Sequence, residues 1–158
     1  MVDCAKDEKV ILYIHSRKLS PMDSKKHIVA ITAFIKNKKG DKFLIVKRST
    51  SEIAYPGKWA FPGGKVEQGD SILDTLKREV QEEVGLDIDD HKEYLYDFTF
   101  VRPDGHNVVG FCFAVKAKSE HVIISKDFED FVWITPEEFA QYDHIPGMEN
   151  EVKLAFKK

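Results

Sequence analysis

The chain has 158 residues, of which 42% are hydrophobic and 32% are charged, and its formal net charge at pH 7 is -3. This length and balance predict one globular domain and exclude a disordered or fibrous chain. The slightly negative charge argues against a broadly basic nucleic-acid binder, so we expect no nucleic-acid polymer as a partner.

Residues 1–26 are interpreted as an N-terminal extension, and residues 27–158 as the main domain. The extension lacks the basic start and long apolar stretch of a signal peptide. Its apolar run at residues 10–14 fits a short strand but cannot cross a bilayer. Two cysteines, Cys4 and Cys112, are too few for a disulfide framework. We therefore expect a reduced, cytoplasmic protein with no membrane partner.

The main domain begins with a predicted β-hairpin. Residues 27–36 are rich in β-branched side chains and predict a largely buried strand. Residues 37–41 contain turn-forming residues, and residues 42–47 predict the partner strand. A short apolar strand follows at residues 59–61, and Pro62-Gly63-Gly64 is predicted to end it as a turn.

The clearest predicted helix covers residues 71–84. Apolar side chains recur on one side of this segment, with a main spacing of four residues. They are Ile72, Leu73, Leu76, Val80 and Val84. Gly85 follows at the position where glycine commonly ends a helix.

The second half of the chain predicts further strands and two shorter helices. Residues 93–102 and 107–117 predict a second hairpin, and residues 131–134 predict another strand. Thr135 is a suitable N-cap for a short helix, and a final helix is expected at residues 150–157. This order predicts an α+β fold in which helices pack against a mixed β-sheet.

Three glutamates lie on one side of the predicted central helix. Glu79, Glu82 and Glu83 have the spacing i, i+3, i+4, which places their Cβ atoms roughly 5–6 Å apart. Arg78 can pair with Glu82, but one guanidinium cannot neutralise three carboxylates. A hard divalent cation such as Mg²⁺ would do so. The alternative is an ordinary solvated helix face, which is the usual role of a charge run.

The wider pattern resembles the Nudix box, G-x5-E-x7-R-E-U-x-E-E-x-G-U, in which U is an aliphatic residue. The matching residues are Gly64, Arg78, Glu79, Val80, Glu82, Glu83, Gly85 and Leu86. Residues 59–63 and 131–139 are also similar to Nudix sequences. Asp70 departs from the pattern, because it stands where the family has its first glutamate. The resemblance implies the Nudix fold, a mixed β-sheet sandwiched between helices.

The resemblance also implies an activity and roles for the box residues. Nudix hydrolases cleave the diphosphate linkage of a nucleoside diphosphate derivative, using Mg²⁺ or Mn²⁺. The implied metal ligands are the Gly63 carbonyl, Glu79, Glu82 and Glu83, with Glu129 as the candidate from a later loop. Glu79 and Glu82 would be catalytic, with Glu79 as the candidate general base. Arg78 would hold a box glutamate in place. Gly64 and Asp70 would support the loop.

Two residues outside the box are candidates for substrate binding. Arg48 occupies a place where the family often has a phosphate-binding arginine, although a plain surface charge is an equal alternative. Asn150 lies in a stretch similar to the one in which MutT-type enzymes read a purine base; its alternative role is an N-cap. We expect a (d)NTP pyrophosphohydrolase of MutT type, working as a monomer or homodimer. The alternatives are an ADP-ribose or nucleotide-sugar pyrophosphatase and a non-catalytic nucleotide-binding regulatory module.

Overall fold

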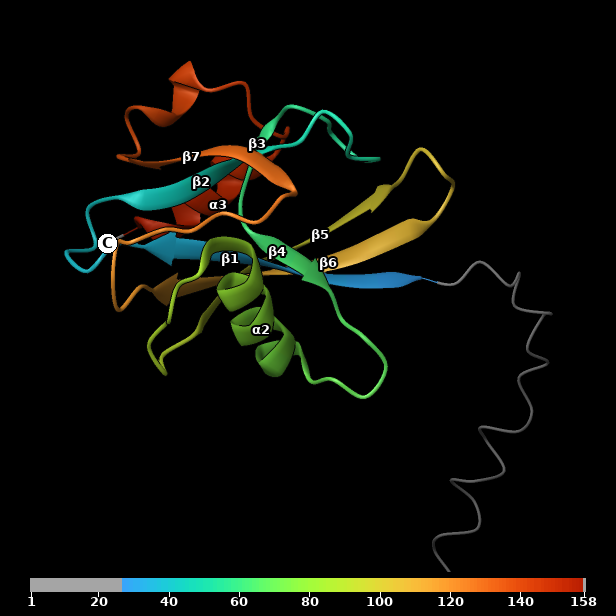
Figure 1. The fold of residues 1–158 in the computed structure, drawn as a ribbon, viewed down its shortest axis with the longest axis horizontal. Coiled ribbons are helices and arrows are strands. Elements are labelled where there is room, and N and C mark those ends of the chain that lie inside the picture. Colours follow the sequence, from blue (N-terminus) through green and yellow to red (C-terminus); the bar gives the residue numbers. More distant parts are fainter. Residues whose placement is uncertain (1–26, 158) are drawn as a thin grey trace, which may run out of the picture.

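A mixed seven-stranded sheet forms the centre of the computed structural model, which describes residues 27–157 (Figure 1). Five strands follow the order β3-β2-β1-β6-β5, while β4 pairs with β1 and β7 pairs with β2. The strands are β1 (Ile28–Lys36), β2 (Phe43–Arg48), β3 (Trp59–Ala60), β4 (Gly63–Lys65), β5 (Glu93–Val101), β6 (Asn107–Lys116) and β7 (Phe128–Ile134). The helices are α2 (Ile72–Val84) and α3 (Met148–Ala155). β1 and β6 are parallel, and the other described strand pairs are antiparallel.

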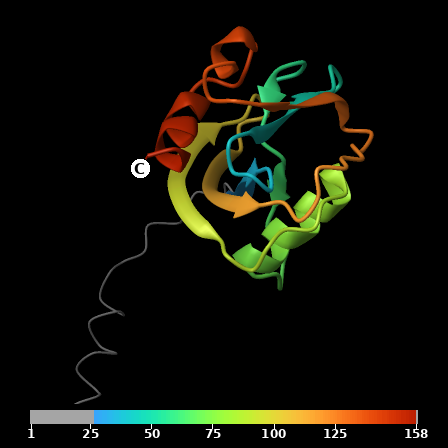
Figure 2. The same ribbon diagram turned by 90° about the vertical axis from the view of Figure 1, so that its left-hand side faces the viewer.

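The two helices cover opposite sides of the sheet, as Figure 2 shows. Successive side chains of a strand point to opposite faces, so each central strand contributes to two cores. Ile31 and Ala33 of β1 pack with the buried side chains of α2. Phe34 of β1 and Cys112 of β6 pack with those of α3. The α+β sandwich predicted from the sequence is therefore confirmed.

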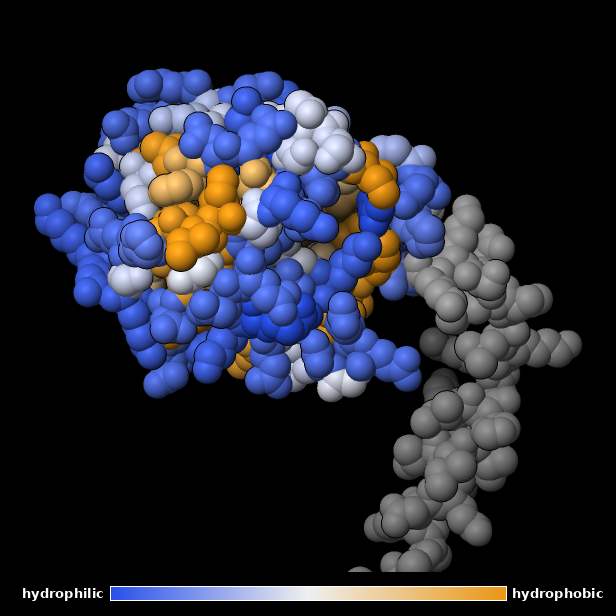
Figure 3. Space-filling view, viewed as in Figure 1, coloured by the Kyte–Doolittle hydropathy of each residue, from blue (hydrophilic) through white to orange (hydrophobic). Residues whose placement is uncertain are grey.

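Helix α2 begins and ends close to the predicted residues. The Ser71 hydroxyl accepts a hydrogen bond from the backbone N–H of Asp74 at 3.1 Å and caps the helix. Gly85 adopts a φ of 67° and ends it. Leu73, predicted on the apolar side, is instead 46% exposed, and the fully buried Thr75 takes a place in the core. The outward side of α2 is hydrophilic (Figure 3).

The Gly63-Gly64 segment is a strand and not the predicted turn. It belongs to β4, where Gly63 lies opposite Thr32 and Gly64 lies opposite Ile31. A Cβ atom on Gly63 would lie 2.1 Å from the carbonyl oxygen of Ile31. The missing side chain therefore lets β4 approach β1 closely enough to pair with it.

The C-terminal elements differ from the prediction in their bounds. β7 begins at Phe128, three residues earlier than expected. The helix expected from Thr135 is a single 3₁₀ turn at Phe139–Gln141. α3 begins two residues early, so Asn150 lies inside the helix and is not its N-cap. The strand expected at residues 10–14 lies outside the described residues. No helix within residues 27–157 is long and apolar enough to span a membrane.

Candidate active site

One guanidinium group connects three carboxylates at the acidic side of α2. Nη1 of Arg78 donates to Glu79 at 2.9 Å and to Glu82 at 3.2 Å. Nη2 of the same side chain donates to Asp70 at 3.4 Å. Asp70 therefore reaches the helix despite its shorter side chain, and Arg78 ties the loop before α2 to the acids on α2.

Glu79 lies against the backbone of β4. A Cβ atom on Gly64 would be between 2.2 and 2.4 Å from the Glu79 carboxylate atoms. Only a glycine leaves room for the carboxylate at this place. Burial raises the pKa of Glu79, and the positive charge and hydrogen bond of Arg78 oppose that shift. The strand and the arginine together fix the position of this carboxylate.

Glu83 is the most deeply buried carboxylate of the group. Its Oε2 accepts a hydrogen bond from the backbone N–H of Gly63 at 2.7 Å. Burial raises the pKa of Glu83 to about 8, although the Gly63 N–H favours the ionised form, and the negative charge of Glu79 adds to the increase. The structure thus places the backbone of Gly63 beside the carboxylate of Glu83.

The carboxyls of Glu79, Glu82 and Glu83 and the carbonyl of Gly63 fit a hard divalent cation by their chemistry. All are oxygen donors, the type that Mg²⁺ and Mn²⁺ prefer. Two of the carboxyls, Glu79 and Glu83, have pKa values raised by burial and by nearby negative charge, and a bound cation would relieve both effects. Within residues 27–157, no three acidic, His or Cys side chains form a ready metal cluster. Arg78 instead provides the positive charge beside Glu79 and Glu82.

A cleft of about 970 Å³ extends beside these groups, within the usual size range of a ligand site. At its acidic end, the cleft is lined by Gly63, Gly64 and Glu83. Strand β5 and helix α3 contribute aromatic, apolar and acidic side chains. They include Tyr96, Phe98, Phe100, Met148 and Glu151. Glu83 of α2 thus borders a space large enough for a nucleotide.

Arg48 lines the cleft, as expected for a substrate-binding residue. Its Nε donates to the carbonyl of Ala54 at 2.9 Å, and its Nη2 pairs with Glu52 at 2.6 Å. Its positive charge also favours the ionised form of Glu83 and so acts to lower the pKa of that carboxyl. Arg48 therefore holds the loop after β2 while facing the acidic end of the cleft.

The structure does not bring Glu129 into the cleft. Its carboxylate accepts a hydrogen bond from the backbone N–H of Thr50 at 3.1 Å and pairs with Lys47 at 3.6 Å, and these contacts lower its pKa. Asp127, two residues earlier, lines the cleft, and its charge raises the pKa of Glu83. Asp127 is the later acid that the fold places near Glu83.

Asn150 likewise does not line the cleft, and it lies on the exposed side of α3. Its neighbour Glu151 is only 6% exposed and lines the cleft. The sequence analysis missed Glu151, although a signal was present. Met148, Glu151, Val152 and Ala155 follow the i, i+3, i+4, i+7 spacing of a buried helix face.

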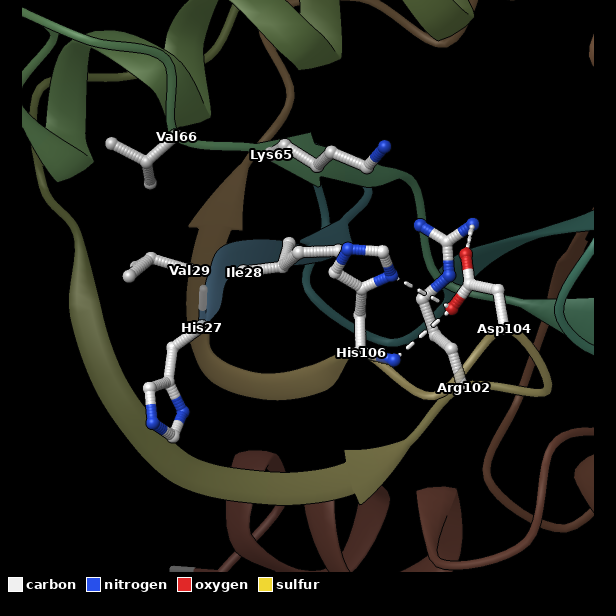
Figure 4. A pocket seen from close by; sticks show the side chains of 8 residues that line it. All are labelled: His27, Ile28, Val29, Lys65, Val66, Arg102, Asp104 and His106. Carbon is white, nitrogen blue, oxygen red and sulfur yellow. Dashed lines mark hydrogen bonds and ion pairs between the residues drawn. The ribbon is translucent and has the colours of Figure 1, made fainter. Parts of the chain in front are cut away.

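A smaller hollow of about 530 Å³ opens beside the cleft (Figure 4). Ile28, Lys65 and Arg102 line both spaces. In the hollow, Asp104 pairs with Arg102 at 3.0 Å and with His106 at 3.1 Å. The one acid of the hollow thus already has two partners, the guanidinium of Arg102 and the imidazole of His106, and the ammonium of Lys65 extends toward the same space (Figure 4).

The fold and the site define an α+β hydrolase-type domain in which an acidic helix and a glycine strand border a nucleotide-sized cleft. A family model of the NUDIX domain matches residues 26–154. The chain therefore belongs to the Nudix hydrolase family. It is an enzyme that cleaves phosphoric anhydrides, a Nudix pyrophosphohydrolase.

Individual relatives agree with this family assignment. The chain is 30% identical over 110 residues to nucleoside triphosphatase NudI of Salmonella arizonae, covering 64% of this chain and 78% of the relative. It is 33% identical, with the same coverage, to NudI of Escherichia fergusonii. The solution structure of the E. coli ORF135 protein has a TM-score of 0.68 and 26% identity, covering 85% of this chain and 92% of that one.

Two further solved structures show the same fold at lower identity. The MutT protein of Methanosarcina mazei has a TM-score of 0.70 and 24% identity, covering 84% of this chain and 94% of that one. The NUDIX domain of Shewanella oneidensis NrtR, complexed with ADP ribose, has a TM-score of 0.70 and 18% identity. It covers 92% of this chain and 95% of that one.

Proposed function

We propose that this Nudix hydrolase is a Mg²⁺-dependent pyrophosphohydrolase of (d)NTPs, which releases a nucleoside monophosphate and pyrophosphate. The observation that carries the proposal is the buried Glu83 carboxyl, bonded to Gly63 and adjacent to Glu79, at the edge of a nucleotide-sized cleft. The similarity to nucleoside triphosphatase NudI supports the triphosphate as the substrate.

Glu82, Glu83 and the Gly63 carbonyl would hold the cation, with Glu79 as a further ligand or as the general base. When bound, Mg²⁺ or Mn²⁺ screens the phosphate charge and lowers the pKa of a coordinated water. The chain itself contributes carboxylates fixed in position by Gly63, Gly64 and Arg78. Preorganised charge of this kind needs little rearrangement during the reaction.

In the proposed reaction, the oxygen of water bonds to phosphorus, and the bond from phosphorus to the bridging oxygen breaks. Glu79 takes the proton from the attacking water. Its carboxylate is held in place for this role by the hydrogen bond from Arg78, and it fits against β4 because Gly64 has no side chain. Arg78 is a positioning residue that contacts Glu79 and Glu82. Arg48, which lines the acidic end of the cleft, is proposed to bind a substrate phosphate.

The test is a product screen over (d)NTPs, ADP-ribose, nucleotide sugars and dinucleoside polyphosphates, with Mg²⁺ and with EDTA. We expect equal amounts of monophosphate and pyrophosphate from a triphosphate, only with Mg²⁺. Turnover of ADP-ribose or a nucleotide sugar alone would replace the proposed substrate class. Binding without turnover of any compound would favour the regulatory module. Glu120→Gln, at an exposed glutamate outside the cleft, is the matched control for Gln substitutions in the box.

A further inference from the structure

Arg102 lies between the cleft and the smaller hollow, and most of its side chain is buried. Only 12% of that side chain is exposed, and its Nη2 pairs with Asp104 at 3.0 Å. The Nε–H of Arg102 is buried and has no hydrogen-bond partner among the described residues. Buried donors in proteins are nearly always paired. The unpaired Nε–H therefore indicates that a further acceptor binds beside Arg102.

The residues that line the hollow carry more positive than negative charge. Lys65 and Arg102 are the two side chains with a permanent positive charge at neutral pH, and Asp104 is the one acid. Asp104 pairs with Arg102 and with His106, and Figure 4 shows no ion pair between Asp104 and Lys65. The ammonium of Lys65 and the guanidinium of Arg102 extend to the same side of the hollow (Figure 4). One carboxylate balances only one of these two charges, so the hollow favours a negatively charged ligand.

Apolar side chains form much of the remaining wall of the hollow. They are Ile28 and Val29 at the start of β1 and Val66 just after β4. Apolar surroundings lower the local dielectric constant, which strengthens the attraction between a cation and a bound anion. The volume of about 530 Å³ lies within the usual range of small-molecule sites. The hollow is thus large enough for a small anion with several oxygen atoms.

The hollow is separate from the groups proposed to react. Neither Gly63 nor Glu83, which border the acidic end of the cleft, lines the hollow. The aromatic side chains of β5 that line the cleft are also outside it. The residues common to the two spaces are Ile28, Lys65 and Arg102. A ligand in the hollow would therefore lie beside a nucleotide in the cleft and would not take its place.

We propose that this hollow is a second anion site, which binds a free phosphate-bearing anion such as pyrophosphate while a nucleotide occupies the cleft. Phosphate oxygens accept hydrogen bonds from arginine and lysine, and a phosphate group brings more negative charge and more acceptors than a carboxylate. A Nudix pyrophosphohydrolase releases phosphate-bearing products at every turnover, so the anion is always available to the site. Because Lys65 and Arg102 line both spaces, an anion in the hollow reduces the positive charge that faces the cleft.

Calorimetry with pyrophosphate tests the site directly, on the full chain in metal-free buffer at constant ionic strength. The affinity for pyrophosphate should fall about tenfold or more in Lys65→Met and in Arg102→Met, because each removes a charge-assisted contact. Lys38→Met is the matched control, since it makes the same change in an exposed turn beyond the other end of β1. It should leave the affinity as in the wild type. Unchanged affinity in both Lys65→Met and Arg102→Met would overturn the inference.

Asp104→Asn provides a test that a misfolded variant cannot imitate. The substitution removes the negative charge that competes with the ligand for Arg102, so pyrophosphate should bind about threefold more tightly or better. Weaker binding in Asp104→Asn would contradict an anion site at this place.

A second titration determines whether the hollow is separate from the cleft. Pyrophosphate is added to the wild type saturated with a (d)NTP, again without a divalent cation, so that no hydrolysis occurs. Pyrophosphate should still bind, with an affinity within about tenfold of that for the free enzyme, because the two ligands are coupled but do not overlap. Affinity that falls in proportion to the nucleotide concentration, without reaching a limit, would show a single shared site and overturn the inference. Neither titration requires turnover, so the second site and the proposed function can fail independently.

Discussion

The two adjacent glycines of β4 should respond to alanine in opposite ways. At Gly64, the new Cβ atom would lie between 2.2 and 2.4 Å from the carboxylate of Glu79, which is the mobile end of a long side chain. At Gly63, it would lie 2.1 Å from the carbonyl oxygen of Ile31 and 2.7 Å from the Cα of Thr32, which are backbone atoms. The first clash is relieved by a side-chain movement, and the second only by separating β4 from β1.

The expected magnitudes follow from these contacts. Moving Glu79 breaks its partly exposed ion pair with Arg78, so Gly64→Ala should lower the free energy of unfolding by about 1 kcal/mol or less. Displacing a catalytic carboxylate by about 1 Å or more should lower kcat about 100-fold. Gly63→Ala adds a methyl group to a packed strand pair and should lower the free energy of unfolding by about 3 kcal/mol or more.

Urea unfolding and steady-state turnover of a (d)NTP, measured on the same preparations, test this pair. The expected pattern is a stable but inactive Gly64→Ala and a clearly destabilised Gly63→Ala. Gly64→Ala with turnover near that of the wild type would refute the placement of Glu79 over β4. Equal destabilisation by both substitutions would refute the distinction between side-chain and backbone contacts.

Three further predictions concern the acids and their arginine. Glu82→Gln and Glu83→Gln should each remove most turnover while circular dichroism shows an unchanged fold; near-normal activity in both would eliminate their catalytic assignment. In EDTA, the free energy of unfolding should fall between about pH 5 and pH 9, because the folded-state pKa of Glu83 is about 8 against an ordinary 4.5. The neutral carboxyl stabilises the folded state at low pH, and that contribution, at most about 5 kcal/mol, is lost as the pH rises through 8. Urea unfolding should show a weaker decrease in Glu83→Gln, and parallel curves would contradict the raised pKa. Arg78→Lys keeps the positive charge but loses the forked pair of N–H donors. Turnover should fall about tenfold or more, while the free energy of unfolding changes by less than about 1 kcal/mol. An unchanged kcat would show that Arg78 does not position the acids.

Helix α2 was predictable because its signals are local. The spacing of Leu76, Val80 and Val84 and the capping residues Ser71 and Gly85 all lie within or next to the helix. Local patterns of this kind specify a helix and the side of it that carries the acids. The box residues of α2 were therefore placed correctly relative to one another before the fold was known.

Strand β4 was not predictable in this way. Gly63 and Gly64 have low strand propensity, and the preceding Pro62 suggests a break. The strand forms because β1 offers hydrogen-bond partners on one side and because glycine permits the close approach. The structure of this segment is decided by its contact with β1, which lies well before it in the chain. A local pattern does not include that contact and therefore predicts a turn.

The α3 residue that lines the cleft was not predicted for a similar reason. Asn150 has an amide suited to reading a base, whereas a glutamate is rarely buried, so residue chemistry alone favoured Asn150 over Glu151, which lines the cleft. One residue along a helix is a rotation of 100°, which separates the exposed Asn150 from the buried Glu151. Asp127 and Glu129 lie on either side of Phe128, where β7 begins, and of these two acids Asp127 lines the cleft.

We propose that the carboxylates beside β4 hold a divalent cation, and manganese-soaked crystals test this claim most directly. Anomalous diffraction should show Mn²⁺ in contact with Glu83 and with at least one of Glu79 and Glu82. The same peak should be absent from crystals of Glu83→Gln. Wild-type crystals in which these side chains point into solvent, with no anomalous peak beside Gly63, would contradict the claim.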